Sequence, residues 1–350
     1  KSQDEVIPST ATDYSEILLA YSNPGGYNML SVLDDDIEIN DLQYNDNENS
    51  IVKQHGGVFT WQPDMWEWEN GIKDSYESTY TQIMGVNAVL DGVDDVEGSV
   101  EEKEVVKAQA LGLRAYYYFM LVNLYGEPYN YNKKALGVPL KLTSALLENG
   151  ITRNTVEEVY TRIVMDLEQA SALFGKYSKR RGDFRINGTA TDILLSRVYL
   201  YMEEWDRAIE AANRAIKRAE GLTDYTTVEA GNQFYMTTYE LSEVEWLFDM
   251  SITNFPFVPS GDLLSKYTNG DKRETLWFNA NGSISKRAQK SGWGPNRTIR
   301  ISEAYLNRAE ALVLSQNANI GEALADLNEL RRHRIVGYQD ISISDATILL

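Results

Sequence analysis

The chain has 350 residues, 43% of them hydrophobic and 24% charged, a composition typical of globular proteins that bury a sizeable core. Asp and Glu number 52 against 33 Lys and Arg, and the resulting formal charge of -19 disfavours binding to nucleic acid and to anionic membrane surfaces. Cys is absent, which excludes disulfides, a thiolate nucleophile and Cys-ligated metal sites.

The first 70 residues are predicted to be loop-rich, because Asn, Asp and Gly interrupt them and no hydrophobic period is sustained. A helical scaffold is predicted over residues 71–220. Its first helix begins near Tyr76 and stops at Gly92, and a second helix covers about residues 101–124. The second helix should carry one apolar stripe that includes the small residues Ala108, Gly112 and Ala115.

Two helical hairpins are expected further along the chain. Before these hairpins, Thr155 and Glu158 form a capping box at the start of another helix. Residues 190–216 form a pair of helices that is broken near Glu203, with the spacing of a tetratricopeptide repeat. Residues 301–332 form a second pair. Because one hairpin cannot bury its own apolar face, the hairpins should stack into a curved array.

Several segments resemble the SusD/RagB family, which comprises surface glycan-binding lipoproteins of Bacteroidetes-type bacteria. Residues 108–128, AQALGLRAYYYFMLVNLYGEP, are similar to a helix and loop of that family, and so are the Tyr80-x-x-Ile-x-x-x-Asn87 helix and the run GVPL at 137–140. ISEAYLNRAEA at 301–311 and ALADLNELRRHR at 323–334 resemble its C-terminal hairpin. The matches follow the family's order.

The resemblance and the periodicity together predict an all-α fold of tetratricopeptide-like hairpins, with irregular N-terminal and central segments. We expect one SusD-like domain over residues 1–350, divided into a loop-rich part at 1–70, the scaffold at 71–220, an aromatic-rich insert at 221–298 and a C-terminal helical pair at 299–350. The family continues into a further helix that is not among these residues.

Two groups of residues are candidates for binding a glycan. Trp61, Trp66 and Trp68 occur within eight residues of a Pro-containing loop and precede Asn70. Indole rings stack on the C–H faces of sugars, and neighbouring amides and carboxylates pair with hydroxyls.

The second group lies in the insert and comprises Tyr267, Trp277 and Trp293. Both groups also admit a packing role, in which the rings only anchor their loops on the helices.

No catalytic residue, cofactor or metal site is predicted. Asp34, Asp36 and Glu38 begin with the spacing of a calcium loop, but Ile39 stands where Gly is required. The two His residues are far apart and lack metal-ligand spacing. No nucleophile motif is present either.

The resemblance implies a protein that is not an enzyme. Such a protein captures oligosaccharide or polysaccharide and delivers it to a SusC-like TonB-dependent transporter. It also implies a surface-exposed position at the outer membrane, held by a lipid anchor that is absent from this sequence.

Two alternatives remain open. A helical-toroid glycoside hydrolase or lyase would suit the length and the stacked hairpins, although the repeat spacing between Leu195 and Ala215 fits an open array better. A repeat scaffold that binds peptides is the other.

Overall fold

The computed structural model describes residues 8–22, 33–38, 56–63, 65, 75–146, 150–178, 181–228, 239–249, 258–279 and 297–342. The helices with defined bounds are α1 (Ala11–Ala20), α3 (Ser75–Gly92), α4 (Val100–Tyr125), α5 (Tyr129–Asn132), α6 (Val156–Phe174), α7 (Gly188–Tyr201), α8 (Trp205–Arg218), α9 (Gly261–Ser265), α10 (Lys272–Trp277), α11 (Ile301–Leu314) and α12 (Ile320–Arg332). The strands are β1 (Ile37–Glu38), β2 (Val244–Asp249), β3 (Val258–Pro259) and β4 (Arg297–Arg300). The predicted all-α class is therefore confirmed.

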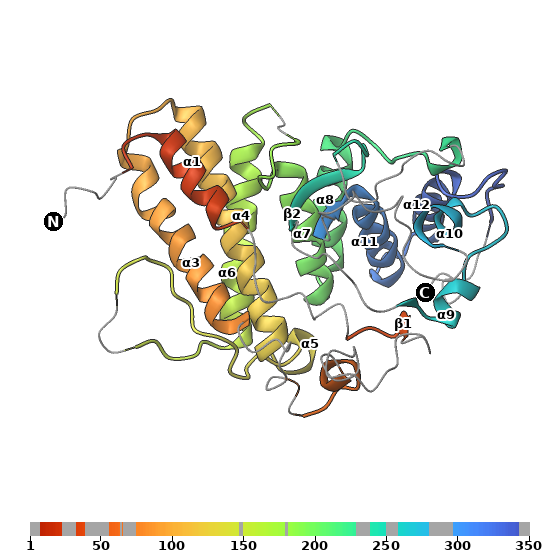
Figure 1. The fold of residues 1–350 in the computed structure, drawn as a ribbon, viewed down its shortest axis with the longest axis horizontal. Coiled ribbons are helices and arrows are strands. Elements are labelled where there is room, and N and C mark those ends of the chain that lie inside the picture. The colour runs from red at the N-terminus through yellow and green to blue at the C-terminus, as the bar shows by residue number, and fades with distance from the viewer. Residues whose placement is uncertain are drawn as a thin grey trace.

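The long helices form an open array. Packing proceeds from α3 to α4, α6, α7, α8, α11 and α12. In Figure 1, α3 and α12 lie at opposite ends of the molecule, so the array does not close into a toroid. The predicted break near Glu203 separates α7 from α8. None of the described helices combines the length and hydrophobicity needed to cross a bilayer.

Capping boxes fix where several helices begin. Thr155 accepts a hydrogen bond from the backbone N–H of Glu158 at the start of α6, as predicted, and Ser99 does the same for α4. The sequence patterns missed α1, which Thr10 caps together with Asp13. This helix is short and covers α3 and α4, so its packing stabilises it more than its own periodicity does.

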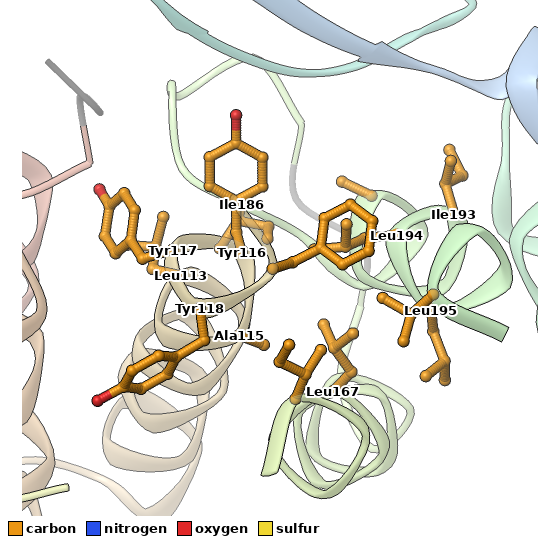
Figure 2. Packing of buried hydrophobic residues seen from close by; sticks show 14 of the residues in the cluster. Leu113, Ala115, Tyr116, Tyr117, Tyr118, Leu167, Ile186, Ile193, Leu194 and Leu195 are labelled. Carbon is orange, nitrogen blue, oxygen red and sulfur yellow. The ribbon is translucent and has the colours of Figure 1, made fainter. Parts of the chain in front are cut away.

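Helix α4 lies at the centre of the fold. Tyr116, Tyr117 and Tyr118 are all buried, and successive residues of a helix project about 100° apart, so their rings leave α4 in three directions (Figure 2). Tyr116 packs edge-on against Trp246 of β2, with ring centroids 5.6 Å apart. The hydroxyl of Tyr118 donates to the carbonyl of Lys141 at 2.7 Å. The predicted apolar stripe on this helix is buried, and neighbours bury further faces of the helix as well.

Two small antiparallel sheets attach the remaining segments. β2 pairs with β4, placing Val244 opposite Arg300, and this ladder brings the insert back to the start of α11. β1 pairs with β3, with Ile37 opposite Pro259. The N-terminal segment and the insert therefore meet although more than half of the chain separates them.

A buried ion pair joins α4 to α6. The Arg114 guanidinium donates to both carboxylate oxygens of Asp166, over 2.7 and 2.8 Å, and its third nitrogen donates to Asn87 Oδ1 of α3 at 3.0 Å. The Asp166 side chain is fully buried, and that of Arg114 is 7% exposed. Such planar, two-pronged pairing is the geometry in which a buried guanidinium is best satisfied.

The same type of pair recurs along the array. Arg197 of α7 forms a fork with Glu303 of α11, over 2.6 and 2.7 Å, and Arg308 of α11 pairs with Asp326 of α12. Asp192 of α7 is buried and contacts Arg214 and Arg218 of α8.

We expect Arg114→Met to lower the free energy of unfolding by about 3 kcal/mol, because Asp166 would stay buried with only the partly exposed Arg162 as a charged partner. Urea denaturation measures this loss. The double variant Arg114→Met/Asp166→Leu should recover part of it, since no unpaired charge is then buried.

Lys107→Met is the matched control on α4, because Lys107 pairs with Asp94 at the surface. It should cost less than about 1 kcal/mol. Equal losses for Arg114→Met and Lys107→Met would contradict the importance assigned to the buried pair.

Candidate functional site

The structure describes three of the predicted glycan-binding residues. Trp66, Trp68, Asn70 and Trp293 lie outside the described residues. Trp61, Tyr267 and Trp277 can be placed, and they occupy different environments.

Trp61 follows a helical turn at residues 56–59 after one intervening residue, and it is 61% exposed. Its φ of 54° lies in the left-handed region, which is uncommon for residues other than Gly. The backbone N–H of Trp61 donates to the carbonyl of Val58 at 3.1 Å, and that of Gln62 donates to Gly57 at 2.9 Å. These bonds hold a turn that presents the indole to solvent.

Tyr267 and Trp277 lie on either side of Arg273. The guanidinium carbon is 5.3 Å from the Tyr267 ring centroid and 6.0 Å from that of Trp277. Tyr267 is half-buried, and this burial raises the pKa of its hydroxyl. The Trp277 ring packs edge-on against the buried Tyr225, with centroids 5.9 Å apart, and belongs to a second hydrophobic cluster. Trp277 therefore contributes to packing, and both Tyr267 and Trp277 are only partly buried.

A cleft that the sequence did not reveal lies where α4, α7 and α8 meet α5. Its cavity volume is about 420 Å³, and we call it the α5 cleft. It is lined by Asn123, Pro128, Tyr129, Asn130, Leu200, Tyr201, Glu203, Trp205 and Glu310. In the view of Figure 1, α5 and the helical turn that precedes Trp61 both lie at the lower edge of the molecule.

The aromatic rings of the α5 cleft are held by the core behind them. Tyr201 ends α7, is 50% exposed and packs edge-on against Phe119, with centroids 5.1 Å apart. Tyr129 begins α5 and lies 4.9 Å from the buried Tyr160. Trp205 begins α8 and is half-buried against the main core. All three rings thus pack on the core and stay partly exposed, and Lys133 Nζ lies over the Tyr129 ring, 5.5 Å from its centroid.

Amides and carboxylates lie beside these rings. Asn130 donates from Nδ2 to Glu203 Oε1 at 2.9 Å, which joins α5 to the turn between α7 and α8. Asn123 donates to the carbonyl of Phe119 at 2.7 Å and accepts from the hydroxyl of Tyr160 at 3.0 Å, and Glu310 is exposed. Among the described residues the lining carries two carboxylates, and the nearby Lys133 is paired with Glu157 at 3.2 Å, so an anionic ligand is disfavoured.

This combination suits a neutral, hydroxyl-rich ligand. Aromatic faces accept the C–H surface of a sugar, while amide and carboxylate groups pair with its hydroxyls. The lining residues come from five helices, α4, α5, α7, α8 and α11, which are dispersed along the sequence, and this explains why sequence reasoning missed them. A sequence feature that could have indicated the cleft is YNYN at 129–132, a Tyr- and Asn-rich run directly after Pro128.

In the part of the chain that the structure describes, no group of three or more His, Asp or Glu side chains is placed to hold a metal ion.

Comparisons with known proteins agree with this fold. Residues 2–200 match a family model described as SusD-like, "Starch-binding associating with outer membrane". A SusD-like protein P25 from Formosa agariphila is 22% identical over 258 residues, which cover 72% of this chain and 44% of that relative. The chain thus spans less than half the length of this curated relative.

Two solved structures show the same architecture. A SusD-like carbohydrate binding protein from Bacteroides vulgatus superposes with a TM-score of 0.75 and 20% identity, covering 98% of this chain and 79% of its own. A laminarin binding SusD-like protein gives a TM-score of 0.66 and 18% identity, covering 97% and 87%. Because the family model matches more than half of the sequence, and because the helical array is the one that these structures share, the chain belongs to the SusD-like family.

Proposed function

We propose that this protein captures neutral oligosaccharides at the α5 cleft and at Trp61, and passes them to a TonB-dependent transporter. The observation that carries the proposal is the accessible set of rings at Tyr129, Tyr201 and Trp205 beside amides and carboxylates. Family membership supports a glycan as the ligand class, and the laminarin-binding relative makes a β-glucan the first probe to test.

A binding function also suits the carboxylates of the α5 cleft better than catalysis does. A glycosidase keeps one carboxylic acid protonated, usually by burying it in apolar surroundings. Glu203 and Glu310 are both exposed, and Glu203 accepts a hydrogen bond from Asn130. They are suited to accept hydrogen bonds from sugar hydroxyls rather than to donate a proton to a glycosidic oxygen.

The proposed place of action is the outer surface of the outer membrane, with a lipid anchor on the protein. The family description refers to association with that membrane, and the acidic chain itself offers little attraction for anionic lipid.

Tyr201→Ala and Trp61→Ala should each weaken binding of laminarin. Each removes an exposed ring of the kind that dominates binding energies, so we expect a loss of about 5- to 150-fold. Affinity electrophoresis with laminarin, starch and xylan identifies the retarding polysaccharide, and calorimetric titration measures the loss.

Tyr131→Ala is the matched control, because Tyr131 is on α5 and 81% exposed but does not line the cleft. It should bind like the parent, and all three variants should melt close to the parent temperature. Parent-like binding by both Tyr201→Ala and Trp61→Ala would place the site elsewhere.

Incubation with the polysaccharide that the protein retards should release no reducing ends. The physical reason is the absence of a shielded acid among the cleft carboxylates. Sustained release that disappears in Glu203→Gln or Glu310→Gln would instead identify a glycosidase.

Cells that produce the full-length precursor should carry the protein in the outer-membrane fraction, where protease added outside intact cells digests it. Mild detergent should co-extract a TonB-dependent transporter with it. Recovery in the soluble periplasmic fraction, together with a periplasmic marker protein, would contradict this location.

A further inference from the structure

A second cavity lies at the opposite end of α7 from the α5 cleft. It has a volume of about 260 Å³, and we call it the α7 cavity. Its walls come from α4, the end of α6, the loop after α6, the first turn of α7 and the end of α8. The two sites are separated by the 14 residues of α7, about 20 Å at 1.5 Å per residue.

Two buried oxygens in this cavity lack hydrogen bonds. Gln109 is 4% exposed and Thr189 is fully buried, and both line the cavity. Neither Gln109 Oε1 nor Thr189 Oγ1 has a hydrogen-bond partner among the described residues. An unpaired buried polar group costs free energy, so each of these oxygens needs a partner that the described part of the chain does not provide.

The charged groups around the cavity are already compensated. Arg218 lies 2.9 Å from the buried Asp192, and Arg185 donates to Glu16 at 2.7 Å. Asp183 adds one more carboxylate to the lining. Among the residues that the structure describes around the cavity there is therefore no surplus positive charge, which disfavours phosphate and carboxylate ligands.

The wall of the cavity is closely packed at the first residue of α7. A Cβ atom at Gly188 would come within 2.7 Å of Arg218 Nη1 and 2.9 Å of Phe174 Cβ, so the first residue of α7 must be small. Val105, Phe174 and Ile186 provide apolar wall, whereas the exposed Gly175 and Ser178 line the side that opens to solvent.

We propose that the α7 cavity is a separate binding site for a small, neutral, polyhydroxylated molecule the size of one sugar ring. A hydroxyl group both donates and accepts, so one hydroxyl satisfies the Gln109 amide and another pairs with Thr189 Oγ1. Apolar C–H groups of the ring face Phe174 and Ile186. The volume lies just below the roughly 300–1,000 Å³ of sites for drug-sized ligands, which fits one ring rather than a chain.

This proposal does not depend on the α5 cleft. The rival occupant of the α7 cavity is a cluster of ordered water, which also satisfies buried polar groups. If ordered water fills the cavity, substitutions of Gln109 and Thr189 should not change the affinity of the protein for free sugars.

The test is a calorimetric and NMR titration of the whole protein with D-glucose, D-galactose, D-mannose and D-xylose. At least one of these should bind the parent. Gln109→Met and Thr189→Val keep the side-chain size but remove the polar oxygens, and each should weaken that binding by about 2- to 10-fold. Neither should lower the melting temperature, since no protein hydrogen bond is lost.

Two control variants establish whether the sugar binds in the α7 cavity. Gln82 Oε1 is another buried amide oxygen without a partner among the described residues, but Gln82 does not line the α7 cavity. Gln82→Met should therefore leave sugar binding unchanged. Tyr201→Ala at the α5 cleft should also leave it unchanged. A crystal soaked in the bound sugar should show the ring beside Gln109.

Three results would overturn the proposal. The first is that none of these sugars binds. The second is that Gln109→Met and Thr189→Val both bind sugar as tightly as the parent protein. The third is that the soaked cavity contains only water. Loss of binding in Tyr201→Ala but not in Gln109→Met would assign the monosaccharide to the α5 cleft instead.

Discussion

A guanidinium group that is withdrawn from water needs a carboxylate of matching geometry, and Arg114 imposes this requirement in the N-terminal part of the helical array. Its contacts with Asp166 and Asn87 fix how α3, α4 and α6 lie against one another. Apolar packing alone is non-directional and would tolerate sliding of smooth helix faces. The buried pair admits one register, and the three tyrosines that follow Arg114 then have definite positions on all sides of α4.

The later hairpins also use arginine–carboxylate pairs between helices, but the two hairpins differ in which helices the pair joins. Asp326 is the seventh residue of α12 and pairs with Arg308, whereas the seventh residue of α8 is Ala211. Without an acid at that position, Arg197 of α7 is paired with Glu303 of α11. One arginine thus links two hairpins instead of closing its own, which ties the middle of the array to its C-terminal part.

The helices could be predicted from sequence because capping and periodicity are local. Thr155 and the break near Glu203 were correctly assigned on this basis. The α5 cleft could not be predicted from sequence, because Tyr129 and Tyr201 are distant in sequence and meet only after α4 and α7 have packed. Likewise, the sequence around Trp277 did not show that its ring packs against Tyr225 and the insert's own core, and its predicted role in binding stays a prediction. Exposure is a property of the assembled fold, so an aromatic residue in a loop does not reveal it.

The β2–β4 ladder also determines how the protein tolerates change. Val244 and Arg300 face each other, so the intervening segment starts and finishes at the same place on the scaffold. A segment with adjacent ends can be exchanged for one of another length at an entropic cost that grows only logarithmically. Parts of the insert away from its contacts with β1 and with residues 334–336 can therefore change in length or sequence between homologues while the helical framework stays the same.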